Sequence, residues 1–455
     1  MSRTRTRIAG SILVAIIVSI LWLAKMAGAV GAGYAAKQLC SGVFVAHLPE
    51  RFILETDVLP RLATLGPLAG LLAYDFDERQ NTVVASMLGQ QQTARHFAGY
   101  GCTLVHKKIG ESSHPTTNPL TAARDSIASP AVARSGIPNL ELALDAAFVE
   151  PPQGGRNTLA IVVMHRGEIV AERYSQPVNV ETPMQGWSMN KSLMATFIGY
   201  QVDRAHLRLD ASVREALLTA GVSKGLASKI DDNLTLRHLL SMTTGFDFSE
   251  RYFPGDDVTN MLYREGSMWQ SAPKAGHLHP PGRHFSYSSG DINTASLLWQ
   301  QSLHGEPYPD WISDRFSGPL RLHAMTLEPD NSGIQVGSSY AYLTARDWAQ
   351  MGQLWLDAWH GRSKLISQQW QRMAVTPGTA EHGEIYGLGF WLNTDQRAFP
   401  SAPEATFHAG GNSGQFVVVI PEQELVVVRL GLTLNESEAH LDNLLNTLLA
   451  TFQSM

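Results

Sequence analysis

The first part of the chain combines arginines with a long apolar run. Arg3, Arg5 and Arg7 precede an uncharged stretch over residues 8–24, and Lys25 follows it. As a helix rising 1.5 Å per residue, this stretch reaches about 25 Å, which is enough for a thin bilayer. Because flanking arginines stay on the cytoplasmic side, the pattern predicts a membrane helix with the rest of the chain exported.

The same segment has a second interpretation as a cleaved signal peptide. Small residues at Ala27-Gly28-Ala29 follow the apolar run, as at a cleavage site. The run is long for a signal sequence and Lys25 interrupts the approach to the small residues, which favours an uncleaved anchor over residues 1–36. We therefore expect a single-pass protein of the bacterial inner membrane with its folded body in the periplasm, or a secreted body if the segment is cleaved.

A smaller unit is predicted over residues 37–125. Short strands over 72–76 and 82–86 flank a turn-like polar segment, and residues 111–118 form a polar Ser/Thr/Pro stretch typical of a linker. The unit contains both cysteines of the chain, Cys40 and Cys102. In an oxidising compartment these two favour one disulfide, with two separate buried thiols as the alternative.

The hydrophobic pattern of residues 126–455 changes from strands to helices and back. A helix over 140–147 and two strands precede a mostly helical region from 200 to about 350, and strands return before a final helix. The predicted strands cover 159–164, 168–174, 390–392, 415–420 and 424–430, and the later helices cover 344–359 and 438–452. Strands at both ends predict an α+β domain, with an antiparallel sheet built from both ends, flanked by helices, and a helical insertion.

Composition and charge narrow the classes of partner. The chain is 44% hydrophobic and 17% charged, as expected of a globular protein, and its net charge of −6 comes without a basic stripe. We therefore expect no nucleic-acid partner. The one expected macromolecular contact is the membrane, through the N-terminal helix.

The first candidate catalytic motif is Trp187-Ser188-Met189-Asn190-Lys191, at the start of a predicted helix. Residues three apart share a helix face, so the Ser188 hydroxyl and the Lys191 ammonium can meet. A serine needs an adjacent base to act as a nucleophile, and a lysine in a partly dry pocket can supply one. Alone, the motif could also be a helix-capping serine beside a solvated lysine.

Two later segments strengthen the catalytic interpretation of Ser188 and Lys191. Tyr287 lies in a tight loop before a predicted helix, where a phenol beside an ammonium can accept a proton. Further along, Phe407-His408-Ala409-Gly410-Gly411 opens a predicted strand, and glycines there allow close substrate approach and N–H donation to an oxyanion.

In this order, Ser188-x-x-Lys191, Tyr287-Ser-Ser and His408-x-Gly410 resemble the serine β-lactamase and penicillin-binding protein superfamily. The similarity is to its class C-like branch, with its esterases and nylon-oligomer (6-aminohexanoate-dimer) hydrolases, and it covers roughly residues 140–455. It implies a β-lactamase-like domain over 126–455 in which Ser188 is acylated and Lys191 and Tyr287 share proton transfer. It also implies an oxyanion hole formed by the Ser188 and Gly411 N–H groups.

Two positions depart from the family pattern. His408 stands where most lactamases have the lysine of Lys-Thr-Gly, and Ser289 stands where class C enzymes have the asparagine of Tyr-x-Asn. With Gly410, these positions are expected to contact substrate. Because both missing groups contact the β-lactam in that family, the sequence favours an amidase or esterase over a β-lactamase.

Other candidate motifs carry less weight. Residues 337–341 nearly match Gly-x-Ser-x-Gly, but no parallel sheet is predicted around them. His277, His279 and His284 lie close together around two prolines, without a carboxylate at ligand spacing, which favours a loop at the cleft rim over a metal site. No metal and no cofactor are expected.

The sequence thus predicts an exported, membrane-anchored serine hydrolase. Its substrate would be a small molecule or short peptide with an amide or ester bond, cleaved through an acyl-enzyme. The alternative is a slowly acylated penicillin-binding-type sensor or binding protein without efficient turnover.

Overall fold

The computed structural model describes residues 2–106 and 136–453. Its centre is a six-stranded sheet in the order β10-β11-β12-β13-β5-β6, in which all neighbours are antiparallel. The strands are β5 (Thr158–His165), β6 (Glu168–Tyr174), β10 (Trp391–Leu392), β11 (Phe407–Gly411), β12 (Gln415–Ile420) and β13 (Leu425–Gly431). Pairing of β13 with β5 joins the two ends of the domain, which confirms the predicted α+β sheet.

Both faces of this sheet are buried, which explains its valine-rich strands. Alternate residues of β5, β12 and β13 face two separate hydrophobic cores. One core packs against α13 (Ala345–Trp359), and the other against α4 (Pro138–Phe148) and α15 (Leu441–Gln453). These are the predicted helices over 344–359, 140–147 and 438–452, so the apolar periodicity identified the layers on both sides of the sheet.

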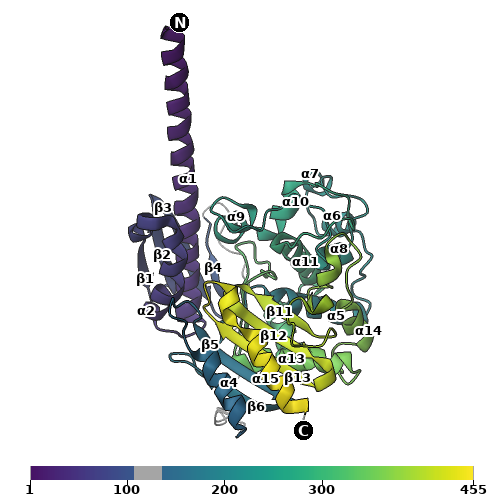
Figure 1. Ribbon diagram of the computed structural model, residues 1–455. Helices are drawn as coiled ribbons and strands as arrows, with labels where there is room; N and C mark the ends of the chain where they lie inside the picture. The colour runs from purple at the N-terminus through teal and green to yellow at the C-terminus, as the bar shows by residue number, and fades with distance from the viewer. Residues whose placement is uncertain (1, 107–135, 454–455) are drawn as a thin grey trace.

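The helical insertion lies beside the sheet (Figure 1). At its core are α5 (Met189–Asp203) and α11 (Ser289–Gln301), whose side chains are almost all buried. Around them lie α6 (Val213–Thr219), α7 (Lys224–Ala227), α8 (Leu236–Leu240), α9 (Asp257–Arg264), α10 (Ser271–Ala275), α12 (Tyr308–Ile312) and α14 (Gln368–Ala374). A three-stranded sheet of β7 (Met184–Gln185), β9 (Ala341–Leu343) and β8 (Met325–Leu327) connects the insertion to the body.

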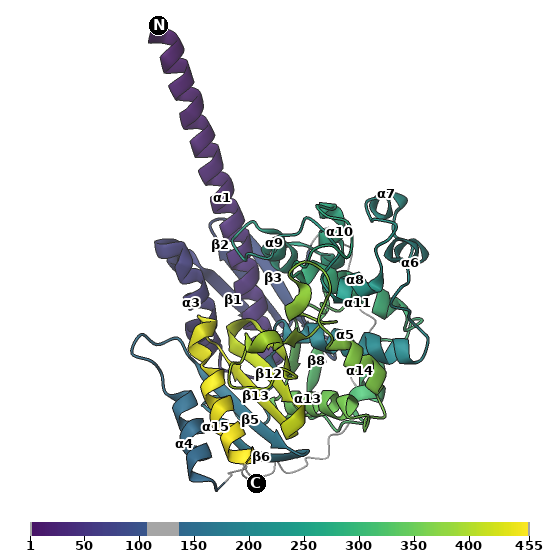
Figure 2. The same ribbon diagram turned by 45° about the vertical axis from the view of Figure 1, so that its right-hand side comes forward.

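Helix α1 (Ser2–Phe44) has two parts with different surroundings. Its stretch from Leu13 to Phe44 is long and apolar enough to cross a membrane by length and composition. The large apolar side chains of residues 13–23 are exposed, whereas residues from Met26 to Ser41 are buried in the protein. Figures 1 and 2 show the first part projecting as a single helix from the body.

The buried part of α1 packs on a four-stranded antiparallel sheet. Its strands are β1 (Ala73–Asp77), β2 (Thr82–Met87), β3 (Gln90–Phe97) and β4 (Gly101–Leu104). β1 and β2 confirm the predicted strands over 72–76 and 82–86, whereas β3 and β4 were not predicted, because β3 is rich in glutamine and carries no clear apolar alternation. A disulfide joins Cys40 of α1 to Cys102 of β4. The predicted linker over 111–118 lies outside the described residues.

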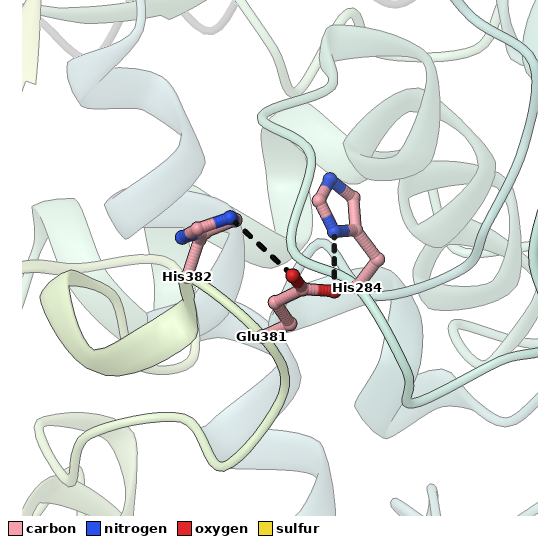
Figure 3. Close-up of side chains that lie close together, drawn as sticks. All are labelled: His284, Glu381 and His382. Carbon is pink, nitrogen blue, oxygen red and sulfur yellow. Dashed lines mark ion pairs between the residues drawn. The ribbon is translucent and has the colours of Figure 1, made fainter.

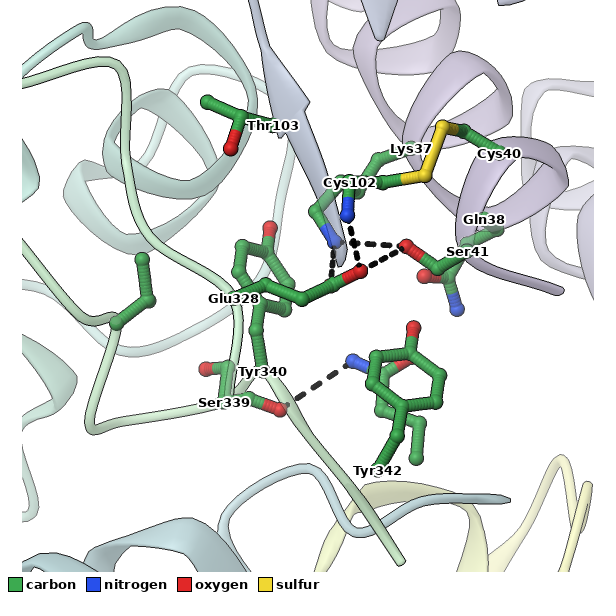
Figure 4. A network of polar contacts seen from close by, with 12 residues as sticks. Lys37, Gln38, Cys40, Ser41, Cys102, Thr103, Glu328, Ser339, Tyr340 and Tyr342 are labelled. Carbon is green, nitrogen blue, oxygen red and sulfur yellow. Dashed lines mark hydrogen bonds and ion pairs between the residues drawn. A yellow bond between two sulfur atoms is a disulfide. The ribbon is translucent and has the colours of Figure 1, made fainter. Parts of the chain in front are cut away.

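Polar bonds also join α1 to the domain that holds the six-stranded sheet (Figure 4). The ammonium of Lys37 forms a buried ion pair with Glu328 and donates to the Ser41 hydroxyl at 2.9 Å. Glu328 also accepts from Ser41 Oγ at 2.8 Å and from the backbone N–H of Cys102 at 2.7 Å. The unit predicted over 37–125 is therefore packed on the larger domain, and α1 runs through the predicted boundary at residue 36 without a break.

Candidate active site

Ser188 stands at the start of α5, where the backbone turns sharply out of β7. Trp187 has a positive φ of 49°, which is unusual for a residue with a bulky side chain and is typical of strained functional turns. Ser188 is partly exposed, and α5 continues from it as a buried helix. One helical turn on, Lys191 Nζ donates to Ser188 Oγ at 2.9 Å, so the predicted i, i+3 pair meets.

Lys191 is buried and surrounded by neutral oxygens. Besides Ser188, its ammonium donates to Ser289 Oγ and to the carbonyl of Ser338, both at 3.0 Å. Burial lowers the pKa of Lys191 from 10.5 to about 8, against the opposing effect of the Glu250 carboxylate. An amine with this pKa can release and accept a proton near neutral pH.

Tyr287 comes from the loop before α11 and reaches the same place. Its ring stacks on Trp391 at a centroid distance of 5.0 Å, and Lys191 Nζ lies 4.7 Å from its ring centroid. Aromatic packing thus fixes the tyrosine beside the Ser188–Lys191 pair.

Behind Lys191 the structure reveals an acidic residue that the sequence did not identify. The backbone N–H of Ser289 donates to Glu250 Oε2 at 2.9 Å, and the Ser289 hydroxyl donates to the other carboxylate oxygen. Burial raises the pKa of Glu250 above its ordinary value, while Lys191 acts in the opposite direction. Hydrogen bonds therefore run from Glu250 through Ser289 to Lys191 and on to Ser188.

This arrangement changes the expected part of Ser289. The side chain is fully buried and is absent from the residues that line the adjoining pocket. Its hydrogen bonds are with Lys191 and Glu250, so it holds the lysine in place, and its expected contact with substrate stays a prediction. Glu250 lies 39 residues before Ser289 in a loop without distinctive pattern, so no local signal could have identified it.

Gly411 ends strand β11 against the backbone of the Ser188 turn. A Cβ at this position would lie 2.1 Å from the carbonyl oxygen of Gly186 and 3.1 Å from the Ser188 nitrogen. Only a glycine allows this approach, and it sets Gly411 directly beside the Ser188 N–H. The two residues predicted to form the oxyanion hole are therefore neighbours in space. The strand expected to open at Phe407 is two strands in the structure, because β11 and β12 are separate and joined by a turn at Asn412–Gly414.

His408 lies on β11 in an aromatic environment. Its ring is 4.9 Å from Phe399, 5.9 Å from Phe416 and 6.5 Å from Trp391 between centroids. Burial lowers the pKa of His408 from 6.5 to about 3. The imidazole is therefore neutral at physiological pH and provides no positive charge at the position of the lactamase lysine.

These residues surround one pocket of about 290 Å³. Its lining includes Ser188, Glu250, Tyr252, Tyr287, Trp391, His408, Gly410, Gly411, Asn412 and Phe416. The structure thus brings together the side chains predicted from three distant segments and places a partly exposed serine hydroxyl at the pocket wall.

Residues 337–341, the near match to Gly-x-Ser-x-Gly, have a structural role. Ser338 and Ser339 are buried, and their hydroxyls lie 2.9 Å apart. Neither lines the pocket described above, and the Ser338 carbonyl accepts from Lys191. This segment therefore supports the lysine and offers no second exposed nucleophile.

The three histidines around the prolines have different surroundings. His277 contacts the Thr244 carbonyl at 3.1 Å, whereas His284 lies with Glu381 and His382 (Figure 3). In this group His284 Nδ1 is 3.5 Å and His382 Nε2 is 3.7 Å from the carboxylate of Glu381, which is 68% exposed. The ligand atoms lie within 4.8 Å of one another. The expectation that no metal takes part stays a prediction.

Comparison with known proteins agrees with this geometry. The chain is 29% identical over 198 residues to penicillin-binding protein 4 of Amycolatopsis lactamdurans, a match that covers 43% of this chain and 47% of that protein, about half its length. It is 22% identical over 330 residues to the 6-aminohexanoate-dimer hydrolase of Paenarthrobacter ureafaciens, covering 69% of this chain and 80% of that one.

Solved structures show the same fold at low identity. EstCE1, a hydrolase with promiscuous acyltransferase activity, superimposes with a TM-score of 0.55 at 16% identity, over 68% of this chain and 98% of that one. A penicillin-binding protein homologue from Caulobacter crescentus gives a TM-score of 0.54 at 16% identity, over 70% of this chain and 98% of that one. The family profile described as Beta-lactamase matches residues 142–451. The chain therefore belongs to the Beta-lactamase family, whose fold and serine-hydrolase chemistry the predicted resemblance identified.

Proposed function

We propose that the protein cleaves an amide or ester bond of a small molecule or short peptide through an acyl-enzyme at Ser188. The observation that carries this proposal is the hydrogen bond from Lys191, an amine of lowered pKa, to a serine hydroxyl at a pocket wall. With a pKa of about 8, roughly a tenth of the molecules carry the neutral amine at pH 7.

The reaction proceeds in two halves. As Ser188 Oγ attacks the carbonyl carbon, its single proton passes to the Lys191–Tyr287 pair, which holds it for the leaving group. The N–H groups of Ser188 and Gly411 stabilise the oxyanion. Collapse of the tetrahedral intermediate breaks the bond to the leaving group, which takes up the proton. Water then attacks the acyl-enzyme by the reverse proton route, which releases the acid and restores the serine.

Labelling with a fluorophosphonate probe tests the nucleophile. We expect the wild-type chain to be labelled and Ser188→Ala to lose all labelling while keeping its fold, because a helix-start Ser→Ala change costs only about 1 kcal/mol. Ser339→Ala is the matched control and should label normally. Persistent labelling of Ser188→Ala, or loss in Ser339→Ala, would contradict the assignment.

Turnover separates the hydrolase from a slowly acylated binding protein. Steady release of p-nitrophenol from p-nitrophenyl acetate supports the hydrolase, and one burst without turnover supports the alternative. Because His408 is neutral and buried, we expect poor capture of a β-lactam carboxylate. Nitrocefin should therefore be hydrolysed slowly or not at all beside measurable ester cleavage, and efficient nitrocefin turnover would refute this specificity.

We further propose that α1 anchors the protein in the bacterial inner membrane with its body in the periplasm. The exposed apolar side chains of residues 13–23 and the Cys40–Cys102 disulfide support this location. The buried part of α1 favours retention of the segment, since cleavage after Ala29 would remove buried residues from the core. Protease added to spheroplasts should degrade the body, and alkylation without reductant should detect no free thiol.

A further inference from the structure

A second pocket adjoins the active-site pocket on the side of α1. It has a volume of about 230 Å³ and lies between α1, the segment from Arg61 to Leu65 and the loop before α9. Ala27 and Val30 of α1, with Leu62 and Leu65, give it an apolar lining. The catalytic domain alone does not form this pocket, because one wall belongs to the N-terminal helix.

The two pockets share part of their walls. Tyr252 and Asn412 line both, and Trp187, the residue before Ser188, lines the apolar one. Arg61 donates to Asn412 Oδ1 at 2.8 Å, so a polar pair borders the junction. A molecule whose carbonyl lies at Ser188 therefore meets polar groups at the junction of the two pockets and the apolar lining of the second pocket on the far side of that junction.

The apolar pocket also lies near the projecting part of α1. Ala27 follows within four residues of Leu23, the last residue of the exposed apolar stretch. The loop before α9 passes beside the helix here, since a Cβ at Gly255 would lie 3.9 Å from both Trp22 and Met26. In the same loop, next to Tyr252 and Pro254 of the pocket lining, Phe253 is 69% exposed. The pocket is thus bordered by apolar side chains that continue toward the anchor.

We propose that this second pocket holds the alkyl chain of an amphiphilic ester or amide whose carbonyl reacts at Ser188. The inference rests on the proposed function and narrows its substrate class to molecules that combine a cleavable carbonyl with an apolar tail. The tail enters the space between α1 and the segment from Arg61 to Leu65, and the carbonyl lies past the Arg61–Asn412 pair. A substrate of this kind, dissolved or in the bilayer, would be recognised by burial of its methylene groups.

Two series of soluble substrates test the proposal in the full-length protein in detergent. One series varies the acyl chain of p-nitrophenyl esters from acetate to octanoate, and the other varies the alcohol of alkyl acetates. All are used below their aggregation limits. In one of the series we expect kcat/KM to rise about fourfold per added methylene until the pocket is full, the ratio that corresponds to burial of one CH₂ group.

Variants that fill the second pocket test whether the rise of kcat/KM with chain length arises there. Leu65→Trp should remove the rise with chain length and leave cleavage of the shortest ester close to wild type. Leu68→Trp is the matched control, because Leu68 lies in the same segment, is exposed and does not line the pocket. Thr64→Trp, at an exposed lining position, provides a second variant if Leu65→Trp does not fold.

The outcomes are distinguishable from failure of the proposed function. If wild type cleaves the shortest ester but both series are flat, or if Leu65→Trp and Leu68→Trp retain the same rise, the tail pocket is refuted and the hydrolase stands. If wild type is neither labelled nor active on any ester, the proposed function itself fails. With the protein reconstituted into anionic vesicles free of detergent, a steeper gain for esters carried in those vesicles than for dissolved ones would assign the membrane as the substrate source, and equal gains would assign solution.

Discussion

Two buried lysines in different regions of the molecule have similar surroundings and opposite consequences. Lys37, in α1, and Lys191, in α5, are each about 1% exposed. Each donates to a serine hydroxyl at 2.9 Å, and each lies over a tyrosine ring, at 3.9 Å for Lys37 and 4.7 Å for Lys191. The difference is the position of the nearest carboxylate.

Lys37 pairs directly with Glu328, whereas Lys191 contacts three neutral oxygens. For Lys191 the nearby carboxylate, Glu250, is bonded to the intervening Ser289. Burial lowers the pKa of both lysines. At Lys37 the directly bonded Glu328 opposes this effect and the ion pair fixes both groups, whereas at Lys191 the opposing carboxylate of Glu250 is not in direct contact with the ammonium. The comparison shows how one residue type holds two regions together in one place and, in the proposed mechanism, transfers a proton in another.

The largest expected effect follows from breaking the ion pair between Lys37 and Glu328. Lys37→Met leaves the buried carboxyl group of Glu328 without its cation, with Ser41 and the Cys102 N–H as its remaining partners, so unfolding should become easier by about 3–5 kcal/mol. Chemical unfolding of the full chain in detergent measures this. Activity per folded molecule should stay near wild type, because Lys37 does not line the active-site pocket.

A double variant sharpens the first prediction. Adding Glu328→Gln to Lys37→Met removes the unpaired charge and should restore most of the lost stability. An unfolding midpoint that Lys37→Met leaves unchanged, or a double variant no better than the single one, would show that this pair does not hold the N-terminal helix.

The matched change in the active site should affect rate instead of stability. Lys191→Met and Tyr287→Phe should each lower the acylation rate by about 10²-fold or more, because each removes a group that moves the Ser188 proton. Their double variant should lose far less than the product of the two effects, since they act as one unit. Stopped-flow measurement of fluorophosphonate labelling gives these rates, and wild-type rates in Tyr287→Phe would remove the tyrosine from the mechanism.

Sequence patterns predicted most of the main domain for identifiable reasons. The period of the apolar residues located the helices on both faces of the six-stranded sheet, and the i, i+3 spacing placed Lys191 against Ser188. The relation of Tyr287 and Gly411 to that pair came from the order of motifs in a known superfamily. No local pattern connects those segments, which lie far apart in the chain.

What the sequence did not predict depends on long-range contacts or on an ambiguous pattern. Glu250 and Glu328 are acidic residues in ordinary loops, and the partners Lys37 and Glu328 are 291 residues apart. The predicted anchor over residues 1–36 includes residues that the structure buries in protein, because a helix buried in protein and one buried in lipid have the same apolar character. Only the tertiary structure separates residues 13–23 from the part packed on β2 and β3.

The smallest expected effect concerns the influence of the Glu250 charge on the pKa of Lys191. The proposed mechanism needs the neutral amine, so kcat/KM for p-nitrophenyl acetate should rise with pH through a midpoint of about 8, the pKa of Lys191. Glu250 raises that pKa, so Glu250→Gln should move the midpoint to lower pH and increase the rate at pH 7 by roughly two- to fivefold. The amide can still accept the Ser289 N–H and donate to its hydroxyl, which preserves the position of the serine.

Glu168→Gln is the control for this prediction. Glu168 lies on the exposed end of β6, so the variant removes the same charge away from Lys191 and should leave the pH profile unchanged. A midpoint that stays in place in Glu250→Gln would mean that Glu250 is protonated in the free enzyme, and the two lysines would then differ by the presence of a carboxylate charge and not merely by its distance.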